Sequence, residues 1–590
     1  MHAPAQELVN VAAWLPLRAS EQPDKPAIVW RSNRDAAGRA VYSQFTFREL
    51  NEACDRHAHG LVRVGISRGT RTILMVRPSA EFFVLTFALY KIGAVPVLID
   101  PGMGRRNMVQ CLRDVNAEAF IGIPLAHALR VLNPGAFRKV RVVITAGWRW
   151  FWRGHRLRDL VGDPDSTSSH SGHIQGPAGP ASQSPDRQIT KSPNLMPFPM
   201  APTSPDDPAA IIFTTGSTGP PKGVLYRHGM FDAQVRILRE RFNIGPDEID
   251  LPTFPLFALF DPALGMTAVI PEMDFTRPAL VDPVKIIEAI RDNGVTHMFG
   301  SPALLDRVGR YGEAHDVALP TLRRVISAGA PVPPAALRRF KKLLSNSAQI
   351  YTPYGATEAL PIAVIGSDEI LGETAALTAQ GLGTCVGMPV DRVEVRIIRI
   401  SDEPIARWSD DLILPLGDVG EIAVRGTVVT REYITSEAAT RLAKIRDDDG
   451  GVWHRMGDLG RFDENSRLWF YGRKAHRVIT EHGALFTEPV EAIFNQHPKV
   501  LRSALVGVGA RPRQTPVVCI EIDKAALQKS DYENPATLGE ELFAIGAKHE
   551  FTKRIDTFLV HPGFPVDIRH NSKIFREKLA VWAAKRLKVK

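Results

Sequence analysis

The sequence predicts an α/β fold: a large N-terminal domain of layered α/β sheets with a β-rich subdomain. The first observation is a strand–helix–strand unit, because apolar, β-branched segments at 71–76 and 94–100 flank a helical pattern at 81–92. The second is that apolar segments at 119–123 and 140–144 continue this alternation. Such alternation is typical of a parallel sheet covered by helices.

The third observation is a change of pattern beyond Leu416, where strand patterns become more frequent. Residues 420–426 are predicted to form a strand followed by a turn. The last part of the chain has its own apolar strands at 503–508 and 516–522, and it closes with a basic helix from Ile574 to Lys588. No internal repeat is visible.

The composition is that of an ordinary globular protein. Of the 590 residues, 44% are hydrophobic and 23% are charged, close to the average for folded domains. Such a length corresponds to about four domain-sized units, which bury large cores without disulfides or metals. The four cysteines have no paired spacing, which argues against a zinc site or a disulfide framework and favours a reducing compartment. They are Cys54, Cys111, Cys385 and Cys519.

No targeting or membrane-spanning segment is predicted. The N-terminal residues 1–7 lack a basic region followed by an apolar core, and no run of eighteen apolar residues occurs. We therefore expect a soluble, cytoplasmic protein with no integral membrane segment. The net charge of +9 is spread along the chain, so nucleic-acid binding is not expected.

Two segments depart from the α/β pattern. Residues 163–207 are rich in Ser, Pro, Gly and Gln and are expected to form a disordered or loosely draped insertion. Just before it, residues 148–153 combine aromatic with cationic side chains. They either contact a partner or membrane surface, or form a packed amphipathic edge whose arginines reach solvent.

The strongest motif is a loop at 214–223 that follows the short apolar strand predicted at 209–213 and precedes a helical run starting near Gly229. Glycines let a backbone approach an anion, hydroxyls donate to phosphate oxygens, and a lysine adds positive charge. The loop therefore predicts a phosphate site rather than a flexible surface turn, although it does not match the Walker pattern. Its candidate ligands are Thr214, Thr215, Gly216, Ser217, Thr218, Gly219 and Lys222.

This loop and three later motifs resemble those of the adenylate-forming enzymes, which include acyl-CoA synthetases, peptide-synthetase adenylation domains and luciferases. The later motifs are Tyr354-Gly355-Ala356-Thr357-Glu358, Gly457-Asp458-Leu459 and Gly472-Arg473, in the family's order. The resemblance covers nearly the whole chain. It implies an N-terminal adenylation domain at 1–472 and a small, mobile α+β lid domain at 473–590.

The resemblance also implies ATP and Mg²⁺ as cofactors and assigns roles to single residues. Glu358 is expected to hold Mg²⁺, and Thr357 to lie near the α-phosphate. Asp458 and Arg473 are expected to bind the ribose hydroxyls. The adenine is expected to lie against small residues and Tyr354. These wall residues are Ala328, Gly329 and Ala330, with Gly355 next to Tyr354. The alternatives are a solvated loop carboxylate for Glu358 and turn-stabilising roles for Asp458 and Arg473.

The family's catalytic lysine corresponds to Lys573, expected to contact the substrate carboxylate and the α-phosphate. Its motif is altered, because Lys573 lies further from Pro565 than usual and follows a serine. A surface lysine at a helix start is the alternative. Ala475 in the hinge and Ala258, where the family often has histidine, are further departures. Together these changes put thioester formation in doubt.

Within the family, residues 472–477 and 570–577 resemble the bacterial β-lactone synthetases of long-chain olefin biosynthesis. That resemblance implies a 2-alkyl-3-hydroxy long-chain fatty acid substrate, whose 3-hydroxyl attacks the adenylate carbonyl and expels AMP. It also implies two partner enzymes in the same pathway, an α/β-hydrolase-type decarboxylase and a reductase. The alternatives are a long-chain acyl-CoA ligase and a non-catalytic scaffold.

Two expectations concern the second step and the acyl chain. His228 lies near the phosphate loop and is a candidate base for the hydroxyl proton, although helix capping is the favoured role. An aromatic cluster either lines an acyl tunnel or belongs to the core. It comprises Phe254, Phe257, Phe260, Met298 and Phe299.

Overall fold

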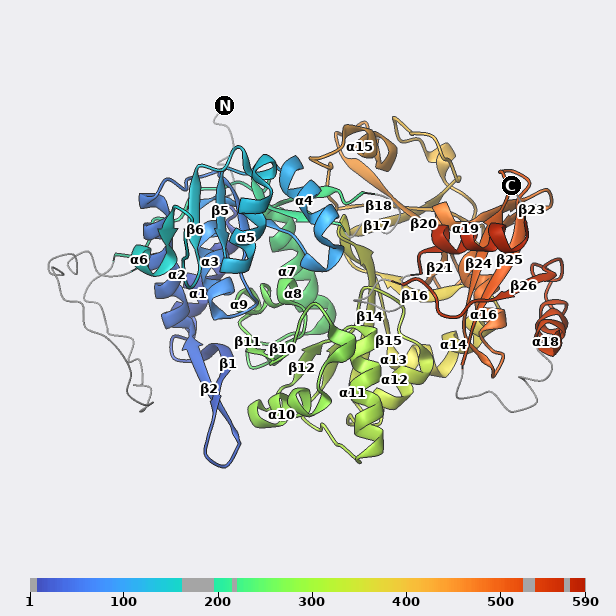
Figure 1. The fold of residues 1–590 in the computed structure, drawn as a ribbon, viewed down its shortest axis with the longest axis horizontal. Coiled ribbons are helices and arrows are strands. Elements are labelled where there is room, and N and C mark those ends of the chain that lie inside the picture. Colours follow the sequence, from blue (N-terminus) through green and yellow to red (C-terminus); the bar gives the residue numbers. More distant parts are fainter. Residues whose placement is uncertain (1–7, 162–195, 215–219, 524–535, 567–573, 589–590) are drawn as a thin grey trace.

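The computed structural model describes residues 8–161, 196–214, 220–523, 536–566 and 574–588 (Figure 1). Two large sheets carry most of the chain, and a third, smaller sheet follows Arg473. The mixed α/β fold confirms the predicted class.

The first sheet contains the predicted strand–helix–strand unit, with β3 parallel to both β4 and β5. Only β9 runs antiparallel, as the partner of β8. The strand order is β7 (His155–Arg156), β6 (Val142–Thr145), β5 (Ala119–Gly122), β3 (Arg71–Met75), β4 (Val95–Leu98), β8 (Pro208–Phe213) and β9 (Gly223–Arg227). The sequence analysis did not predict β9. Because β9 is present, the phosphate loop joins the two strands of a hairpin, and the helix follows only after the second strand.

Helices cover both faces of this sheet because successive side chains of a strand point in opposite directions. Leu74 of β3 packs against α2 (Phe47–Arg63) and α3 (Ala80–Ile92), whereas its neighbour Ile73 packs with α4 (Arg105–Asp114) and α5 (Pro124–Leu132). The short helices α1 (Trp14–Glu21) and α6 (Leu157–Val161) lie beside α2.

The second sheet has a parallel half and an antiparallel half. The parallel strands are β1 (Pro26–Arg34), β11 (Thr267–Ile270), β10 (Ile249–Pro252), β12 (His297–Phe299), β13 (Arg324–Ile326) and β14 (Gln349–Ala356), with β2 (Ala40–Thr46) antiparallel at one edge. The antiparallel half comprises β15 (Ala359–Gly366), β16 (Thr384–Pro389), β21 (Leu468–Arg473), β20 (Val452–Phe462), β18 (Gly420–Gly426), β17 (Val393–Ile398) and β19 (Lys444–Arg446). Consecutive antiparallel strands thus begin at β15, earlier than the predicted change at Leu416.

Helices of the parallel half include α7 (His228–Phe242), α9 (Asp261–Leu264), α10 (Pro283–Asn293), α11 (Pro302–Ala314) and α12 (Pro334–Lys341). Buried side chains of α10, α11 and α12 form one core with β10, β12 and β13. Side chains of α7 and α9 form another, which continues into the antiparallel half. Short helices α8 (Pro255–Ala258), α13 (Ser367–Glu369), α14 (Ala375–Ala379) and α15 (Glu437–Ala443) complete this part.

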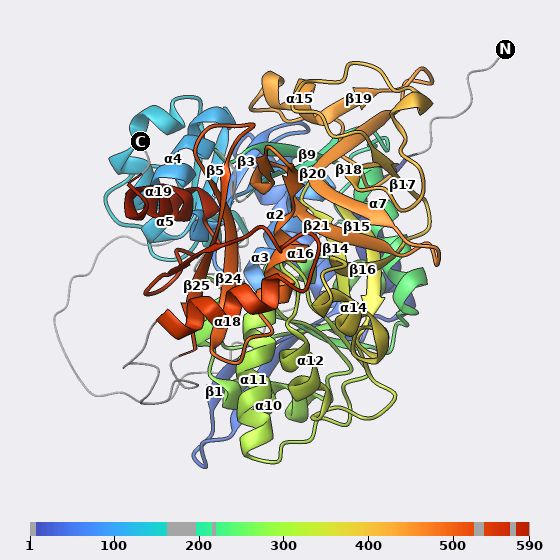
Figure 2. The ribbon, with the colours of Figure 1, turned by 90° about the vertical axis from the view of Figure 1, so that its right-hand side faces the viewer.

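The residues after Arg473 form a separate small α+β layer at one end of the molecule (Figures 1 and 2). Its sheet is β24 (Val500–Val508), β25 (Thr515–Ile522) and β26 (Thr557–Val560), packed with α16 (Thr487–Phe494), α18 (Ala536–Gly546) and α19 (Arg576–Arg586). The predicted closing helix is therefore present with shorter bounds. The hairpin β22 (Val478–Thr480) and β23 (Gly483–Leu485) precedes them.

Most of the stretch expected to be disordered, residues 162–195, lies outside the described residues. Its end, 196–207, differs from that expectation because its backbone is paired. The Ala201 N–H donates to the Lys91 carbonyl at 2.8 Å, and the Val9 N–H donates to the Thr203 carbonyl at 2.9 Å. Among the described residues, no helix has the length and apolarity to cross a membrane.

Candidate active site

The predicted phosphate loop is closed at its base by two hydrogen bonds between Thr214 and the backbone of Lys222. The Thr214 N–H donates to the Lys222 carbonyl at 3.0 Å, and the Lys222 N–H donates to Thr214 Oγ1 at 3.1 Å. The β8–β9 hairpin therefore fixes both ends of the loop. The other predicted ligands, Thr215, Gly216, Ser217, Thr218 and Gly219, lie outside the described residues.

Thr357 and Glu358 form the tight turn between β14 and β15. Their backbone is held from two sides. The Tyr226 hydroxyl donates to the Thr357 carbonyl at 2.6 Å, and both the N–H and the hydroxyl of Thr430 donate to the Glu358 carbonyl, at 2.9 and 3.0 Å. Since Tyr226 belongs to β9, a direct hydrogen bond joins this turn to the strand that follows the phosphate loop.

The carboxylate of Glu358 is held by Tyr433, whose hydroxyl donates to Oε1 at 2.6 Å. Glu358 is half-buried, so it is not the solvated loop carboxylate considered above. Its second oxygen accepts no hydrogen bond from the part of the chain that the structure describes. Mg²⁺ is usually bound by one or two carboxylates together with phosphates and waters, and a single fixed carboxylate with a free oxygen fits that pattern.

Two lysines flank the ring of Tyr433. Lys222 Nζ lies 4.9 Å and Lys444 Nζ 5.9 Å from the ring centroid. Lys444 is buried, and its ammonium donates to the carbonyl of Thr430 and, at 3.1 Å, to its hydroxyl. Burial lowers the pKa of Lys444 to about 7, while the negative charge of Glu358 opposes this shift. The lysines add positive charge beside the predicted phosphate and metal positions.

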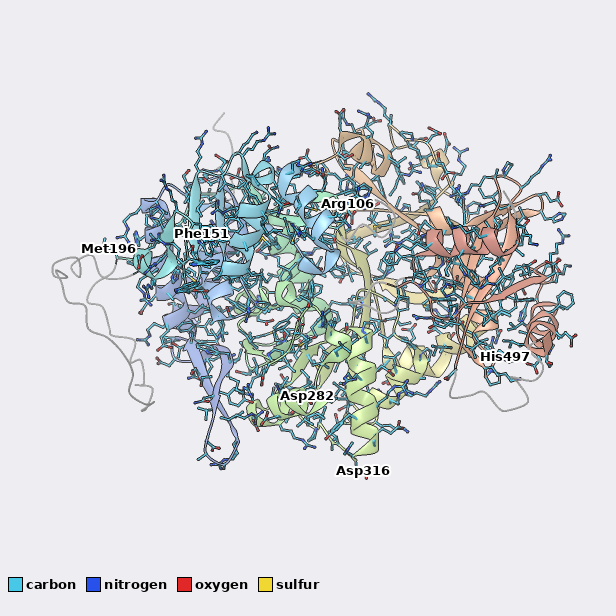
Figure 3. The ribbon with its side chains drawn as sticks, viewed as in Figure 1. Arg106, Phe151, Met196, Asp282, Asp316 and His497 are labelled. Carbon is cyan, nitrogen blue, oxygen red and sulfur yellow. The ribbon has the colours of Figure 1, made fainter. Side chains whose placement is uncertain are left out.

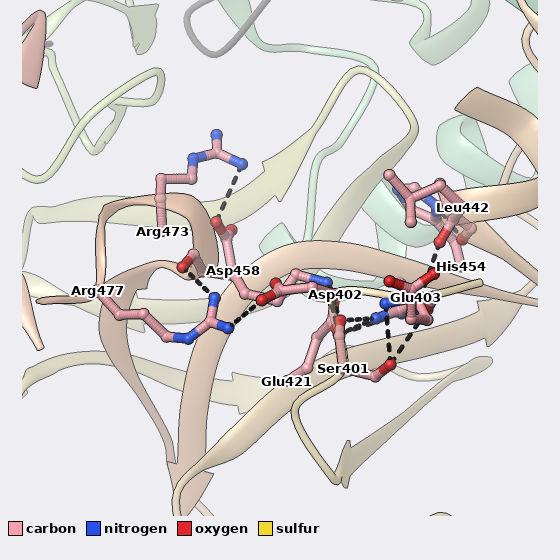
Figure 4. A network of polar contacts seen from close by, with 12 residues as sticks. Ser401, Asp402, Glu403, Glu421, Leu442, His454, Asp458, Arg473 and Arg477 are labelled. Carbon is pink, nitrogen blue, oxygen red and sulfur yellow. Dashed lines mark hydrogen bonds and ion pairs between the residues drawn. The ribbon is translucent and has the colours of Figure 1, made fainter. Parts of the chain in front are cut away.

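Asp458 lies in β20, directly opposite Arg473 of β21. It is buried, and its Oδ2 accepts from the Tyr354 hydroxyl at 2.7 Å. Arg473 Nη1 lies 3.0 Å from Oδ1, an ion pair that is visible in Figure 4, yet Oδ1 has no hydrogen-bond partner among the described residues. Burial raises the pKa of Asp458, and Arg473 opposes the shift. A buried acceptor without a donor is a fitting place for the hydroxyls of a ribose.

The predicted adenine wall follows β13 at the edge of the sheet where the parallel strands end. β13 and β14 are neighbours in register, with Ile326 opposite Tyr351, so Ala328 and Tyr354 extend from adjacent strands. Gly329 is exposed and has a φ of +96°, a conformation that side chains disfavour. Gly355 has no room for a side chain, since a Cβ there would lie 2.6 Å from the Ala359 carbonyl. Ala330 is half-buried next to Gly329.

A narrow apolar cavity of about 70 Å³ lies between α7 and the second sheet and reaches Ala328 of the adenine wall. Phe257, Phe260 and Phe299 line it and also pack in the adjoining core, so both the acyl tunnel and the core remain open for this cluster. Phe254 packs behind them, with its ring centroid 5.3 Å from that of Phe257. Met298, by contrast, belongs to the core on the α10–α11 side.

The cavity also contains four buried polar side chains, which the sequence analysis missed. They are Gln234, Asp250, Asp261 and His297. Among the described residues no hydrogen bond reaches Gln234 Oε1, Asp250 Oδ1 or Asp261 Oδ2. Burial raises the pKa of Asp250 to about 8, and burial together with the charge of Asp250 holds the pKa of Asp261 well above its usual range.

The expectation that His228 caps the helix is wrong, because Arg227 precedes α7 and no side-chain cap is formed there, whereas the role of His228 as a base stays a prediction. The side chain is fully buried at the start of α7, and its Nδ1 accepts from the Val11 N–H at 3.1 Å. Nδ1 is therefore occupied by a backbone donor of the N-terminal segment, and Nε2 has no partner among the described residues. Burial lowers the pKa of His228 to about 4.

The hinge region is tied to the large sheet by ion pairs (Figure 4). Lys474 Nζ lies 2.9 Å from Glu421 Oε1 and donates to the Ser401 carbonyl at 2.7 Å. Arg477 pairs with Asp402 at 2.6 Å. Ala475, the departure noted in the sequence, has only a methyl side chain and cannot join this network of ion pairs. Lys573 lies outside the described residues, so its predicted position is not tested.

Sequence reasoning missed Tyr433, Lys444 and Thr430, which fix Glu358. No motif spacing marks them, because they lie over seventy positions from Glu358 along the chain and meet it only in the folded structure. Tyr226 was missed for the same reason.

A family model described as AMP-binding enzyme matches residues 15–434. An olefin β-lactone synthetase from Xanthomonas campestris pv. campestris is 49% identical over 582 residues, 98% of each chain. One from Stenotrophomonas maltophilia is 49% identical over 584 residues, again 98% of each chain. A 4-chlorobenzoate–CoA ligase from Arthrobacter is 25% identical over 82% of each chain.

Among solved structures, an amide bond synthetase from Marinactinospora thermotolerans has a TM-score of 0.73 at 22% identity, covering 97% of this chain and 99% of its own. An o-succinylbenzoate coenzyme A synthetase from Bacillus subtilis, in complex with ATP and magnesium ion, has a TM-score of 0.69 at 18% identity, covering 96% and 98%. At these identities the likeness concerns the fold.

Proposed function

Because the chain belongs to the AMP-binding family of adenylate-forming enzymes, and within it to the group of the olefin β-lactone synthetases, we propose that it makes a β-lactone. The substrate is a 2-alkyl-3-hydroxy long-chain fatty acid, which is first joined to AMP and then closed by its own hydroxyl. The observation that carries this proposal is the close, full-length likeness to the β-lactone synthetases. The geometry of Glu358, Asp458 and Tyr354 supports the first step.

In the first step a carboxylate oxygen of the acid bonds to the α-phosphorus of ATP, and the bond to diphosphate breaks. Negative charge builds up on both sides of the reacting phosphorus, and fixed positive groups stabilise it. The phosphate loop, from Thr214 to Lys222, holds the departing diphosphate, and Lys444 adds a buried cation nearby. Thr357 lies at the α-phosphate.

The nucleotide is held by the paired groups around Asp458. Oδ1 of Asp458 accepts from the ribose hydroxyls, and Tyr354 and Arg473 fix the carboxylate. The base lies against Ala328, Gly329 and Ala330. Glu358 would hold a Mg²⁺ ion, which when bound would supply positive charge against the phosphates. Tyr433 then has a defined role, since it aims the Glu358 carboxylate.

The catalytic lysine of the site is Lys573, as the family resemblance implies. Arg576, three residues later, is fixed by a bidentate contact with Glu491, so the segment that follows Lys573 is anchored in the small domain. Replacement of Lys573 by alanine is expected to lower diphosphate release about 10²-fold or more, as for other single electrostatic stabilisers.

In the second step the 3-hydroxyl oxygen bonds to the carbonyl carbon of the adenylate, the bond from that carbon to the AMP oxygen breaks, and the hydroxyl proton leaves to water. The hydroxyl nucleophile belongs to the same molecule as the reacting carbon, so no second substrate has to be bound. The loss of translational entropy that binding a separate nucleophile would cost is therefore avoided. Ring strain opposes closure, and the mixed anhydride supplies the driving force. Phe257, Phe260 and Phe299 hold an alkyl chain in the cavity beside the adenine wall.

The strained lactone requires a further enzyme that consumes it. An α/β-hydrolase-type decarboxylase and a reductase remain the expected partners.

AMP release is measured with a synthetic 2-alkyl-3-hydroxy acid and with the same acid lacking the hydroxyl, each with and without CoA. The proposal predicts multiple turnovers with the hydroxy acid alone, and no effect of CoA. The acid without the hydroxyl should give diphosphate but only a single turnover of bound adenylate. If steady AMP release requires CoA, the enzyme is a long-chain acyl-CoA ligase; if neither acid yields diphosphate, the chain is a scaffold.

A further inference from the structure

A loop of exposed aromatic side chains lies at the far end of the molecule from the small domain, where Figure 3 labels Phe151. We name residues 147–154 the aromatic loop. Trp148 is 68% exposed, and Trp150 and Phe151 are each 64% exposed. The rings contact one another, with centroids 6.3 Å apart for the two tryptophans and 4.9 Å apart for Trp150 and Phe151. Three adjacent large apolar side chains in solvent are unusual for a surface without a binding role.

The aromatic loop is held in place from below. Trp152 is buried, stacks on His127 with ring centroids 5.0 Å apart, and donates from Nε1 to Thr145 Oγ1 at 2.9 Å. Arg149 donates to the Gly154 carbonyl and closes the loop. Gly154 packs against the backbone of β6 so closely that a Cβ would collide with the Val143 carbonyl. The fold therefore presents the three exposed rings on a fixed base.

Helix α5 extends this apolar surface. Gly147 lies against Pro124, the first residue of α5, with a gap of 4.0 Å from an ideal Cβ to the proline ring. Leu125 and Leu132 are 76% and 68% exposed. They are seven residues apart and therefore share one face of the helix.

The surrounding segment is strongly basic. Residues 119–158 contain eight Lys and Arg and no Asp or Glu. The cations are Arg130, Arg138, Lys139, Arg141, Arg149, Arg153, Arg156 and Arg158. Arg138, Lys139, Arg141, Arg153 and Arg158 are exposed. An acidic partner surface is the complement of such a segment.

We propose that this face docks on an anionic lipid surface, with the exposed rings of Trp148, Trp150 and Phe151 at the level of the headgroups. Tryptophan is enriched at membrane–water interfaces, where an apolar ring meets a polar layer, and anionic headgroups attract nearby cations. The combination of tryptophans with exposed cations and no acid over forty residues favours lipid over a protein partner.

The test uses the full chain and vesicles of phosphatidylcholine alone or mixed with phosphatidylglycerol, without ATP or acid. We expect cosedimentation with the anionic vesicles only, weakened by salt, and a blue shift of tryptophan fluorescence. A triple variant, Trp148→Ser, Trp150→Ser and Phe151→Ser, should bind about 10-fold or more weakly, because it loses the apolar area buried in the interface. The matched control replaces Leu280 and Leu416, which are 66% and 67% exposed elsewhere, by serine and should bind like the wild type.

Reversing one charge gives an independent readout, since Arg153→Glu should lower binding to anionic vesicles about 5-fold or more without removing an aromatic ring. The proposal is overturned if the wild-type chain ignores anionic vesicles, or if the triple variant binds them as tightly as the control. It is also overturned if the wild type is a dimer that the triple variant dissociates, because the face would then cover a second copy. Diphosphate release on a short, soluble 3-hydroxy acid should be the same in all these variants, so the outcome is separate from that of the proposed function.

Discussion

Tyr433 is the residue that most directly controls the geometry of the predicted metal ligand. Its hydroxyl donates to Glu358 at 2.6 Å, and the ammonium groups of Lys222 and Lys444 lie 4.9 and 5.9 Å from its ring centroid. We predict that Tyr433→Phe lowers diphosphate release about 10-fold and raises the Mg²⁺ concentration needed for half-maximal rate, because loss of an orienting partner of a metal ligand typically costs 10- to 100-fold.

The matched control is Tyr42→Phe, which removes a comparable hydroxyl bond, to Asp292 at 3.0 Å, on the protein surface. Rates are compared over a Mg²⁺ titration. Equal Mg²⁺ dependence in the Tyr433 variant and the control would show that Tyr433 does not position the metal ligand.

Replacing Asp458 tests how the ribose is recognised, because the variant and the wild type can each be compared on ATP and 2′-deoxy-ATP. The account places both ribose hydroxyls at its free oxygen, so Asp458→Asn should raise KM for ATP about 10-fold or more, the usual cost of losing a hydrogen bond to a charged group. The wild type should discriminate against 2′-deoxy-ATP, and the variant should do so much less. An unchanged preference for ATP in a correctly folded variant would place the ribose elsewhere.

At this scale the sequence predicts residues that belong to motifs. Recognisable patterns of neighbouring residues led to the prediction of Thr214, Lys222, Thr357, Glu358, Asp458 and Arg473 as site residues. Tyr433 and Lys444 have no such neighbours, and their roles follow only from contacts across the fold. His228 was wrongly expected to cap the helix, because the sequence does not reveal that the Val11 N–H donates to its ring.

Packing of α9 on β10 brings two carboxyls, Asp261 and Asp250, into an apolar cavity. Their pKa values are raised by burial, that of Asp250 to about 8, above the usual value of 3.8. Between these values the folded chain keeps a proton that the unfolded chain has lost. The contribution of this pair to the free energy of unfolding is therefore fully present below about pH 4 and is lost as the pH rises towards about 8.

We predict that Asp261→Asn gains stability relative to the wild type as pH rises from about 5 to 8, because asparagine cannot ionise. The measurement is the urea midpoint of unfolding at several pH values. His297, whose pKa is lowered to about 3 by burial and Arg324, titrates in both chains and cancels from the comparison. Exposed Asp418→Asn is the control, and a constant difference between wild type and Asp261→Asn across this range would contradict the account.

Elements were predicted well where one pattern dominates. The segments at 71–76, 81–92 and 94–100 became β3, α3 and β4, since buried parallel strands are short continuous apolar runs. Strand β9 was missed because Gly223–Arg227 mixes apolar and charged residues directly after the loop, and only pairing with β8 makes it a strand. The closing helix was predicted from Ile574 to Lys588, whereas α19 spans Arg576–Arg586. The predicted bounds were too wide because a basic composition does not mark where a helix begins or ends.

For the whole molecule, the class of fold and the presence of a small α+β layer were predictable from pattern and family resemblance. The placement of the small layer was not, because it depends on single ion pairs such as Lys474–Glu421 and Arg477–Asp402. Rotation about the hinge would have to break these pairs. An enzyme whose second nucleophile is already tethered to the substrate has no thiol to admit, and this agrees with a hinge tied by such contacts.

The central claim is that the chain activates the carboxylate of a 3-hydroxy acid by joining it to AMP. The most direct measurement is mass spectrometry of the products from a synthetic 2-alkyl-3-hydroxy acid labelled with oxygen-18 in its carboxylate. The account predicts a product equal to the acid less one water, with one labelled oxygen retained in the lactone carbonyl and one transferred to AMP. Unlabelled AMP, or a CoA thioester as the only acyl product when CoA is present, would contradict it.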